Sequence, residues 1–122
     1  MTDSLRVLMV EDQSELRDLI GEALRDMGVE VHTANDGPHA LDLLRENPGY
    51  DVVFSDVSMP NGMSGIELSE HVSALQPAAR VILASGYAKS QLPALPAHVE
   101  FLPKPYRLRQ LLTLLQGDAA QA

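Results

Sequence analysis

The sequence lacks cysteine and tryptophan altogether, and it contains only three tyrosines and two phenylalanines among its 122 residues. Without cysteine, the chain can form no disulfide bond, thiol nucleophile or cysteine-ligated zinc site. It also lacks any apolar run close to the roughly 20 residues of a membrane-spanning helix, and no basic segment precedes an apolar one near Met1. We therefore expect a cytoplasmic protein without a signal peptide or membrane contact.

Basic residues are scarce in the first half of the chain. Residues 1–56 contain 13 acidic and 4 basic side chains, whereas residues 57–122 contain 4 and 5, so the two halves carry −9 and +1 of the net charge of −8. An acidic surface repels the phosphate backbone of nucleic acids, and we expect no direct DNA binding. Most of these acids are expected on solvated helix faces, and the remainder are available for a cation. The length and the 45% hydrophobic content predict one domain over residues 1–122.

Short apolar runs rich in β-branched residues alternate with amphipathic stretches along the chain. The stretch from Lys89 to Pro96 breaks this rhythm, because Pro93 and Pro96 permit at most about one turn of helix. The alternation predicts an α/β fold, a doubly wound sheet of five parallel strands with a short or irregular fourth helix. The predicted strands cover residues 5–10, 29–34, 52–56, 80–84 and 99–102, and the predicted helices lie within residues 14–28, 36–47, 65–76 and 108–117.

Polar residues follow four of the predicted strands at the point where each strand ends. They are Glu11 and Asp12 after the first strand, Asp56 after the third, Ser85 after the fourth and Lys104 after the fifth. The carboxyl ends of parallel strands share one edge of the sheet, so these side chains are expected to converge. Three converging carboxylates repel one another unless some are protonated or a divalent cation binds, and oxygen ligands favour magnesium. Lys104 and Ser85 are donors for an anion, and a phosphoryl group fits, with Asp56 as the nucleophile.

The order of these motifs resembles the receiver domain of two-component response regulators. The resemblance covers residues 5 to about 116 and leaves residues 117–122 as a frayed tail. It implies a flavodoxin-like sheet with the strand order 2-1-3-4-5. The motifs that carry it are Val10-Glu11-Asp12, Ser55-Asp56-Val57-Ser58-Met59-Pro60, Met63-Ser64-Gly65, Ala84-Ser85-Gly86 and Leu102-Pro103-Lys104-Pro105.

The resemblance implies that Asp56 accepts a phosphoryl group from the phosphohistidine of a histidine kinase or a histidine phosphotransfer protein. Asp12, Asp56 and the backbone carbonyl of Ser58 would hold Mg²⁺, with Mn²⁺ as an alternative ion, and Glu11 would act through a bound water. Lys104 would pair with the phosphoryl oxygens, and its peptide bond to the following proline is typically cis in this family. Such a protein catalyses only its own phosphorylation and dephosphorylation, so it is not a classical enzyme.

The resemblance also implies a switch, in which Ser85 moves toward the phosphoryl group and the aromatic side chain at Phe101 turns inward. Phe101 lacks the hydroxyl of a tyrosine, so this switch works by packing alone, and Tyr87 and Tyr106 are further candidates for it. The weak helix after the fourth strand leads us to hypothesise that residues 87–97 become ordered on phosphorylation or partner binding. We expect a monomer or a weak dimer.

Two other function classes remain at this point. One is a degenerate receiver, an interaction module that never carries phosphate, although all five polar residues are intact. The other is a phosphate-ester hydrolase with an aspartyl nucleophile, which usually carries a second acid two residues later, where this chain has Ser58. The pattern is similar to receivers of hybrid sensor kinases and to some stand-alone regulators, and the start at Met1 favours an independent protein.

Overall fold

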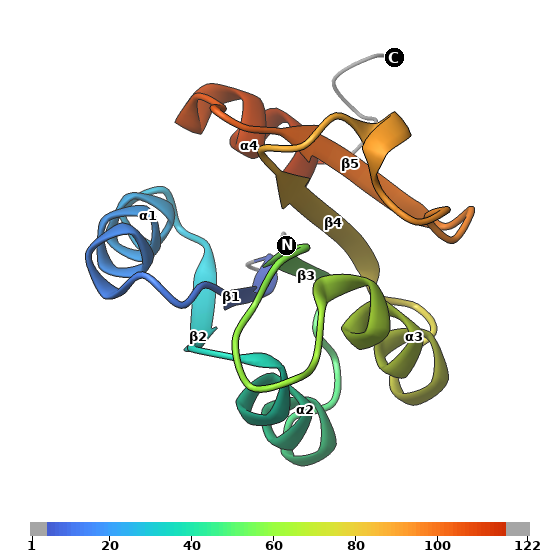
Figure 1. Cartoon of the computed structure of the whole chain (residues 1–122). Helices are drawn as coiled ribbons and strands as arrows, with labels where there is room; N and C mark the ends of the chain where they lie inside the picture. Colours follow the sequence, from blue (N-terminus) through green and yellow to red (C-terminus); the bar gives the residue numbers. More distant parts are fainter. Residues whose placement is uncertain (1–4, 117–122) are drawn as a thin grey trace.

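Five short β-strands lie parallel in one sheet, and α-helices cover both of its faces (Figure 1). The computed structural model describes residues 5–116, so the frayed tail expected at 117–122 lies outside the described residues. The elements in chain order are β1 (Arg6–Val10), α1 (Ser14–Asp26), β2 (Glu30–Ala34), α2 (Gly37–Glu46), β3 (Val52–Asp56), α3 (Gly65–Leu75), β4 (Arg80–Ser85), a 3-10 turn η1 (Lys89–Gln91), β5 (Val99–Pro103) and α4 (Leu108–Leu115). The strands pair in the order β2-β1-β3-β4-β5, which confirms the predicted fold class and strand order.

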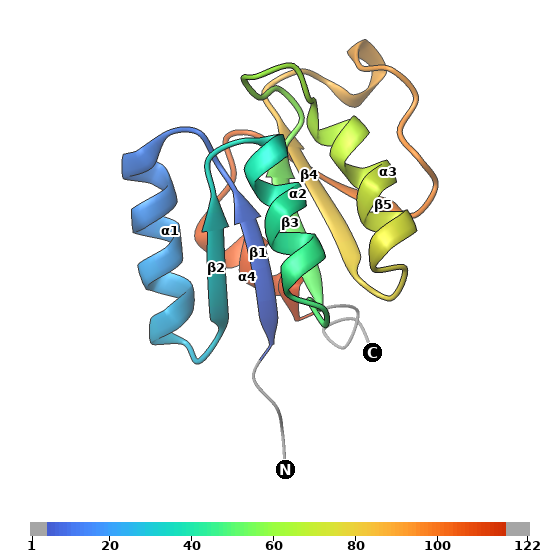
Figure 2. The ribbon, with the colours of Figure 1, turned by 90° about the horizontal axis from the view of Figure 1, so that it is seen from below.

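Two apolar clusters, one on each face, hold the helices against the sheet. Successive residues of a strand point to opposite faces, so each central strand supplies side chains to both clusters. Helices α2 and α3 cover one face, and α1 and α4 cover the other (Figure 2). The first cluster contains Leu8, Val53, Val81 and Leu83 of the sheet with Ala40, Leu44, Leu68 and Val72, and the second contains Met9, Phe54, Ile82 and Leu102 with Ile20, Leu24, Leu111 and Leu115.

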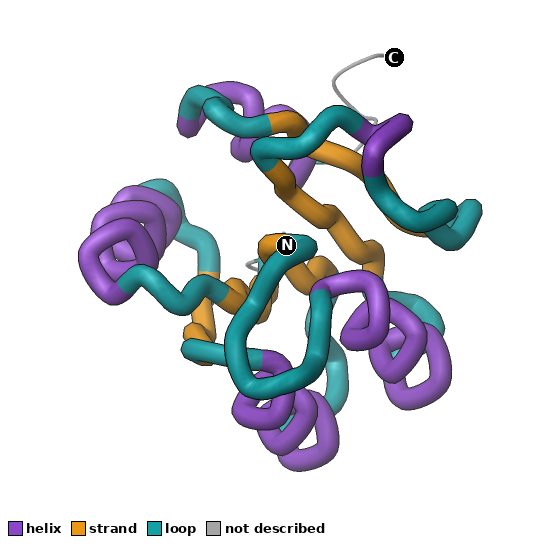
Figure 3. The backbone as a smooth tube through the Cα atoms, in the orientation of Figure 1, coloured by secondary structure: helices purple, strands orange, loops and turns teal. Residues whose placement is uncertain are grey.

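The connection between β4 and β5 contains a single 3-10 turn where the other crossovers contain an α-helix. Figure 3 shows this short turn between two stretches of loop. The prolines at positions 93 and 96 explain the difference, because each removes a backbone donor and clashes with a preceding helical turn. The prediction of at most one helical turn between Lys89 and Pro96 is therefore confirmed.

Two helices begin with side-chain caps that hold their first turns near the carboxyl edge of the sheet. Asp36 accepts a hydrogen bond of 2.8 Å from the backbone N–H of His39 at the start of α2. Ser64 and Glu67 form a reciprocal capping box at the start of α3.

Among residues 5–116, no helix combines the length and the hydrophobicity needed to span a bilayer.

Candidate functional site

The carboxyl end of β3 places Asp56 at the centre of the candidate site. Strand β3 is the middle strand, with β1 on one side and β4 on the other, and all five of its residues are buried. Its apolar run therefore carries Asp56 to the edge of the sheet with only 7% of its surface exposed. The next backbone N–H, that of Val57, donates to the carbonyl of Ala84 at 2.9 Å, which fixes the chain direction as it leaves the strand.

Three carboxyl groups meet at this edge. Oxygen atoms of Glu11, Asp12 and Asp56 all lie within 4.8 Å of one another. Glu11 is buried, with 4% of its surface exposed, whereas Asp12 is exposed to solvent. The backbone N–H of Gln13 donates to Glu11 Oε2 at 3.1 Å and orients that carboxyl group. The structure thus brings together the three acids that the sequence singled out, with one of them open to solvent.

Burial and proximity change the acidity of this cluster. Burial raises the pKa of the Glu11 carboxyl from 4.5 to about 7, and a hydrogen bond with the Asp56 carboxyl adds to the rise. The backbone N–H of Gln13 and the charge of Lys104 lower the same pKa by smaller amounts. Near neutral pH, Glu11 therefore still holds a proton for much of the time. A hard divalent cation fits this all-oxygen cluster, because it would supply the positive charge that the proton now supplies.

Lys104 reaches the same carboxylate from the end of β5. Its Nζ atom lies 2.7 Å from Asp56 Oδ1, and its backbone N–H donates to the carbonyl of Ser85 at 2.8 Å. The carboxylate of this ion pair is largely shielded from solvent, because the Asp56 side chain is only 8% exposed. The Lys104–Pro105 peptide bond is cis, as the resemblance implied. A cation held beside the acid in this way is suited to pair with an anionic group attached to that acid.

A small cavity of about 140 Å³ opens beside Asp56. Ser85 is 5% exposed, and its Oγ accepts a hydrogen bond of 3.0 Å from the backbone N–H of Tyr87. The cavity is several times the roughly 30 Å³ that a water molecule occupies in the liquid. A small anion attached to Asp56 would therefore meet Ser85 and Lys104. The lining residues are Asp56, Ser58, Ala84, Ser85, Gly86, Tyr87 and Lys104.

Phe101 and Ser58 are the remaining residues that were predicted from the sequence to belong to the site. Phe101 is half-buried on β5, where it pairs with Leu83 of the neighbouring strand β4. Leu83 lies two residues before Ser85 on that strand. Ser58 is exposed and lines the cavity next to Asp56. The inward turn of Phe101 and the metal contact of the Ser58 carbonyl stay predictions, because both concern a loaded site.

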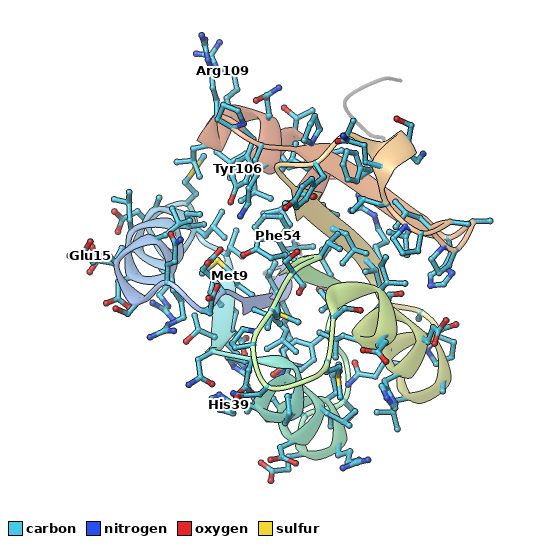
Figure 4. All side chains as sticks on the ribbon, in the orientation of Figure 1. Met9, Glu15, His39, Phe54, Tyr106 and Arg109 are labelled. Carbon is cyan, nitrogen blue, oxygen red and sulfur yellow. The ribbon has the colours of Figure 1, made fainter. Side chains whose placement is uncertain are left out.

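Two further residues shape the site although the sequence had given them no definite role. A Cβ atom at Gly65 would lie 2.1 Å from the backbone oxygen of Asp56, so only glycine lets α3 begin this close to the site. Tyr106 points from the β5–α4 connection toward Phe54 (Figure 4). Gly65 belongs to the motif Met63-Ser64-Gly65 on which the resemblance depends, but the sequence did not show why this position must be glycine. The sequence indicated Tyr106 only as a candidate for the switch, and no local pattern predicted its packing against Phe54.

Comparison with known proteins adds a family and several relatives. The profile described as the response regulator receiver domain matches residues 7–116. The sensor kinase CckA of Brucella abortus is 39% identical over 121 residues, which cover 95% of this chain but only 13% of the kinase. The response regulator receiver protein CpdR of the same organism is 29% identical over 114 residues, which cover 91% of this chain and 93% of CpdR.

A solved structure has the same fold as this chain. The response regulator TrrA of Thermotoga maritima, determined in complex with Mg²⁺-BeF, superposes with a TM-score of 0.80 at 28% sequence identity. The superposition covers 92% of this chain and 96% of TrrA. The chain therefore spans nearly the whole of some relatives and a small part of others.

Proposed function

Since the chain belongs to the response regulator receiver domain family, a family of signalling modules, we propose that it is a phosphoacceptor in a two-component phosphorelay. In this proposal, Asp56 takes a phosphoryl group from the phosphohistidine of a histidine kinase or phosphotransfer protein. The observation that carries the proposal is the contact of 2.7 Å between Lys104 Nζ and Asp56 Oδ1, beside two further acids. The reaction makes the protein a switch that modifies itself, not a classical enzyme.

The transfer itself needs little more than alignment and neutralisation of charge. An oxygen of the Asp56 carboxylate attacks phosphorus, and a P–O bond forms as the P–N bond of the donor breaks. The electron pair of that P–N bond stays on the nitrogen of the donor imidazole. Lys104 then pairs with an oxygen of the transferred group, so its ammonium keeps an anionic partner after Asp56 has become an acyl phosphate.

The acidic residues fit a magnesium site. Glu11, Asp12 and Asp56, with the carbonyl of Ser58, would hold Mg²⁺, as Mg²⁺-BeF in the related TrrA supports. When bound, the ion neutralises charge that collects between the acids and the phosphoryl oxygens. Because the ion competes with the proton on Glu11, Mg²⁺ affinity should fall as the pH drops below about 7.

The same geometry suggests how the signal leaves the site. Ser85 Oγ now accepts a hydrogen bond from the backbone N–H of Tyr87. When Ser85 turns its hydroxyl toward a phosphoryl group on Asp56, the backbone at Tyr87 must follow or lose this bond. Phe101 can then repack against the displaced segment, which changes the surface that partners meet.

Intact mass measurement after treatment with acetyl phosphate and Mg²⁺ tests this proposal. The wild type should gain one phosphoryl group that is labile to base, and Asp56→Asn should gain none. Asp51→Asn is the matched control, because Asp51 precedes the opposite end of β3 and binds the backbone N–H of Arg6 at 2.8 Å. We expect Asp51→Asn to be phosphorylated like the wild type.

Two other results would contradict the proposal. An unmodified wild-type mass in the presence of donor and Mg²⁺ would favour a receiver that acts only as an interaction module. Continuous turnover of added phosphate esters, with no dependence on a histidine donor, would favour a hydrolase.

A further inference from the structure

The hydroxyl group of Tyr106 is the one buried polar side-chain atom without a hydrogen-bond partner among residues 5–116. Folded proteins rarely bury a hydroxyl in this way, because the group loses its hydrogen bonds to water and gains nothing in return. A phenylalanine would fill the same space without that loss. We therefore expect the hydroxyl to find its hydrogen-bond partner in another state of the protein.

The ring of Tyr106 packs against the strand that carries Asp56. It packs edge-on against Phe54, with the ring centroids 5.8 Å apart and an interplanar angle of 81°. Phe54 is 4% exposed and lies two residues before Asp56 on β3, so both side chains are on the same face of the strand. Tyr106 also follows Lys104 by two residues, and both line a cavity of about 610 Å³. The aromatic contact fixes where the hydroxyl lies.

The negative charges of the site act on the phenol of Tyr106. Burial raises the pKa of the Tyr106 phenol, and the charges of Asp56 and Glu11 raise it further. The phenol thus keeps its proton at neutral pH and can donate a hydrogen bond to a carboxylate. The acids of the site are engaged elsewhere in this structure, because Glu11 Oε2 accepts from the backbone N–H of Gln13 at 3.1 Å and Asp56 Oδ1 pairs with Lys104 Nζ at 2.7 Å.

We propose that Tyr106 is a positioning residue of the phosphoacceptor site, whose hydroxyl donates to a carboxylate oxygen of the Glu11–Asp56 pair once a divalent cation has engaged that pair. Loading of the site would reorient the two carboxylates, which would leave an oxygen free to accept a hydrogen bond from the Tyr106 hydroxyl. Tyr106 then holds that carboxylate in its metal-bound orientation. This inference rests on the proposed function, because it concerns the loaded state of the same site.

Substitution of Tyr106 by phenylalanine removes the hydroxyl and retains the ring. Tyr50→Phe is the matched control, because the Tyr50 hydroxyl lies 2.6 Å from His32 Nδ1, a partner in the resting protein. Since the chain has no tryptophan, its near-ultraviolet absorbance reports the three tyrosines directly. Titration with Mg²⁺ alone, followed in this band, gives the affinity and shows whether a tyrosine gains a hydrogen bond. Urea unfolding without divalent ions gives the stability of each variant.

We expect Tyr106→Phe to bind Mg²⁺ about tenfold more weakly, the typical effect of losing one hydrogen bond to a charged group. It should lose the Mg²⁺-induced change in tyrosine absorbance and be at least as stable as the wild type without metal. Tyr50→Phe should be less stable and bind Mg²⁺ normally, with the absorbance change retained.

Three results would overturn the inference. One is a Tyr106→Phe variant with wild-type Mg²⁺ affinity and an unchanged absorbance signal. Another is a metal-free Tyr106→Phe protein that is clearly less stable than the wild type, which would mean that the hydroxyl already has a structural partner. Failure of the wild type to bind Mg²⁺ would overturn the proposed function and this inference with it, whereas the first two results leave the proposed function intact.

Discussion

Two segments border Asp56, and they are held in place in different ways. The β3–α3 segment (residues 57–64) is tied to the helices beside it. Asn61 Nδ2 donates to Asp36 Oδ2 at 2.5 Å, and the backbone N–H of Gly65 donates to the carbonyl of Val57 at 2.7 Å. Met63 also lies over Gly37, so closely that a Cβ atom on that glycine would meet its side chain at 2.7 Å. This border of the site is anchored to both α2 and α3.

The β4–β5 segment (residues 86–98) is held mainly by local bonds. Ala88 and Gln91 bond to each other through backbone and side chain, and the remaining hydrogen bonds of its described residues also join near neighbours. Tyr87 is 61% exposed, and the segment touches the core only through partly buried leucines. The β3–α3 segment therefore holds the acids in position, whereas the β4–β5 segment is free to respond to what binds there.

The largest expected effect comes from comparing two glycines, Gly65 at the end of the β3–α3 segment, where α3 begins, and Gly86 in the β4–β5 segment. Gly65→Ala would place Cβ 2.1 Å from the backbone oxygen of Asp56, whereas a Cβ atom at Gly86 would meet nothing within 4 Å. We expect Gly65→Ala to lower the free energy of unfolding by about 3 kcal/mol or more and to weaken phosphorylation of Asp56. Gly86→Ala should change stability by less than about 0.5 kcal/mol. Urea unfolding measures both, and equal effects would contradict the contrast.

Much of this architecture could be predicted because it depends on local patterns. The apolar runs that end on Glu11, Asp56 and Ser85 define both the strands and the edge where their polar ends meet. Two prolines were enough to predict that β4 and β5 are joined without a full helix. The strand order came from the resemblance, because the order of strands depends on contacts that no local pattern encodes.

The features that could not be predicted depend on contacts between distant residues. The bond between Asp36 and Asn61 spans 25 positions and needs both turns to be in place. Tyr106 has the flanking sequence of an exposed residue, and its burial against Phe54 arises only when β5 and α4 are packed. The clash that excludes a side chain at Gly65 is likewise a property of the folded chain.

An intermediate effect is expected at the anchor between the first border and α2. Asp36→Ala removes both the cap of α2 and the acceptor for Asn61, so we expect a loss of about 1.5 kcal/mol in the free energy of unfolding. Gln91→Ala removes the corresponding side-chain bond of the β4–β5 segment and should cost less than about 0.5 kcal/mol. Asn61→Gly keeps the left-handed backbone, with φ of 68°, and isolates the contribution of the anchor.

The effect of Asp36 should also depend on pH. The hydrogen bonds from His39 and then from Asn61 lower the pKa of this carboxyl below its ordinary value of 3.8. A lowered pKa stabilises the folded state above that value, and the stabilisation is lost as the pH falls through the shifted pKa. The difference between the wild type and Asp36→Ala should therefore shrink in acid. A difference that stays constant with pH would mean that the carboxylate charge is not what anchors this border.

The smallest expected effect concerns the rate at which backbone amide hydrogens exchange with solvent. In the unmodified protein, backbone amides of residues 87–97 should exchange with solvent faster than those that anchor the first border, such as the amide of Gly65. Beryllium trifluoride with Mg²⁺ becomes tetrahedral, like a phosphoryl group, once it binds a carboxylate oxygen. It should slow exchange in residues 87–97 of the wild type, because the backbone at Tyr87 would follow Ser85 toward the ligand through their hydrogen bond. Asp56→Asn should show no such change. If residues 87–97 were already as protected as Gly65 without a ligand, both borders would be equally fixed, and the route from Ser85 through this segment would have to be abandoned.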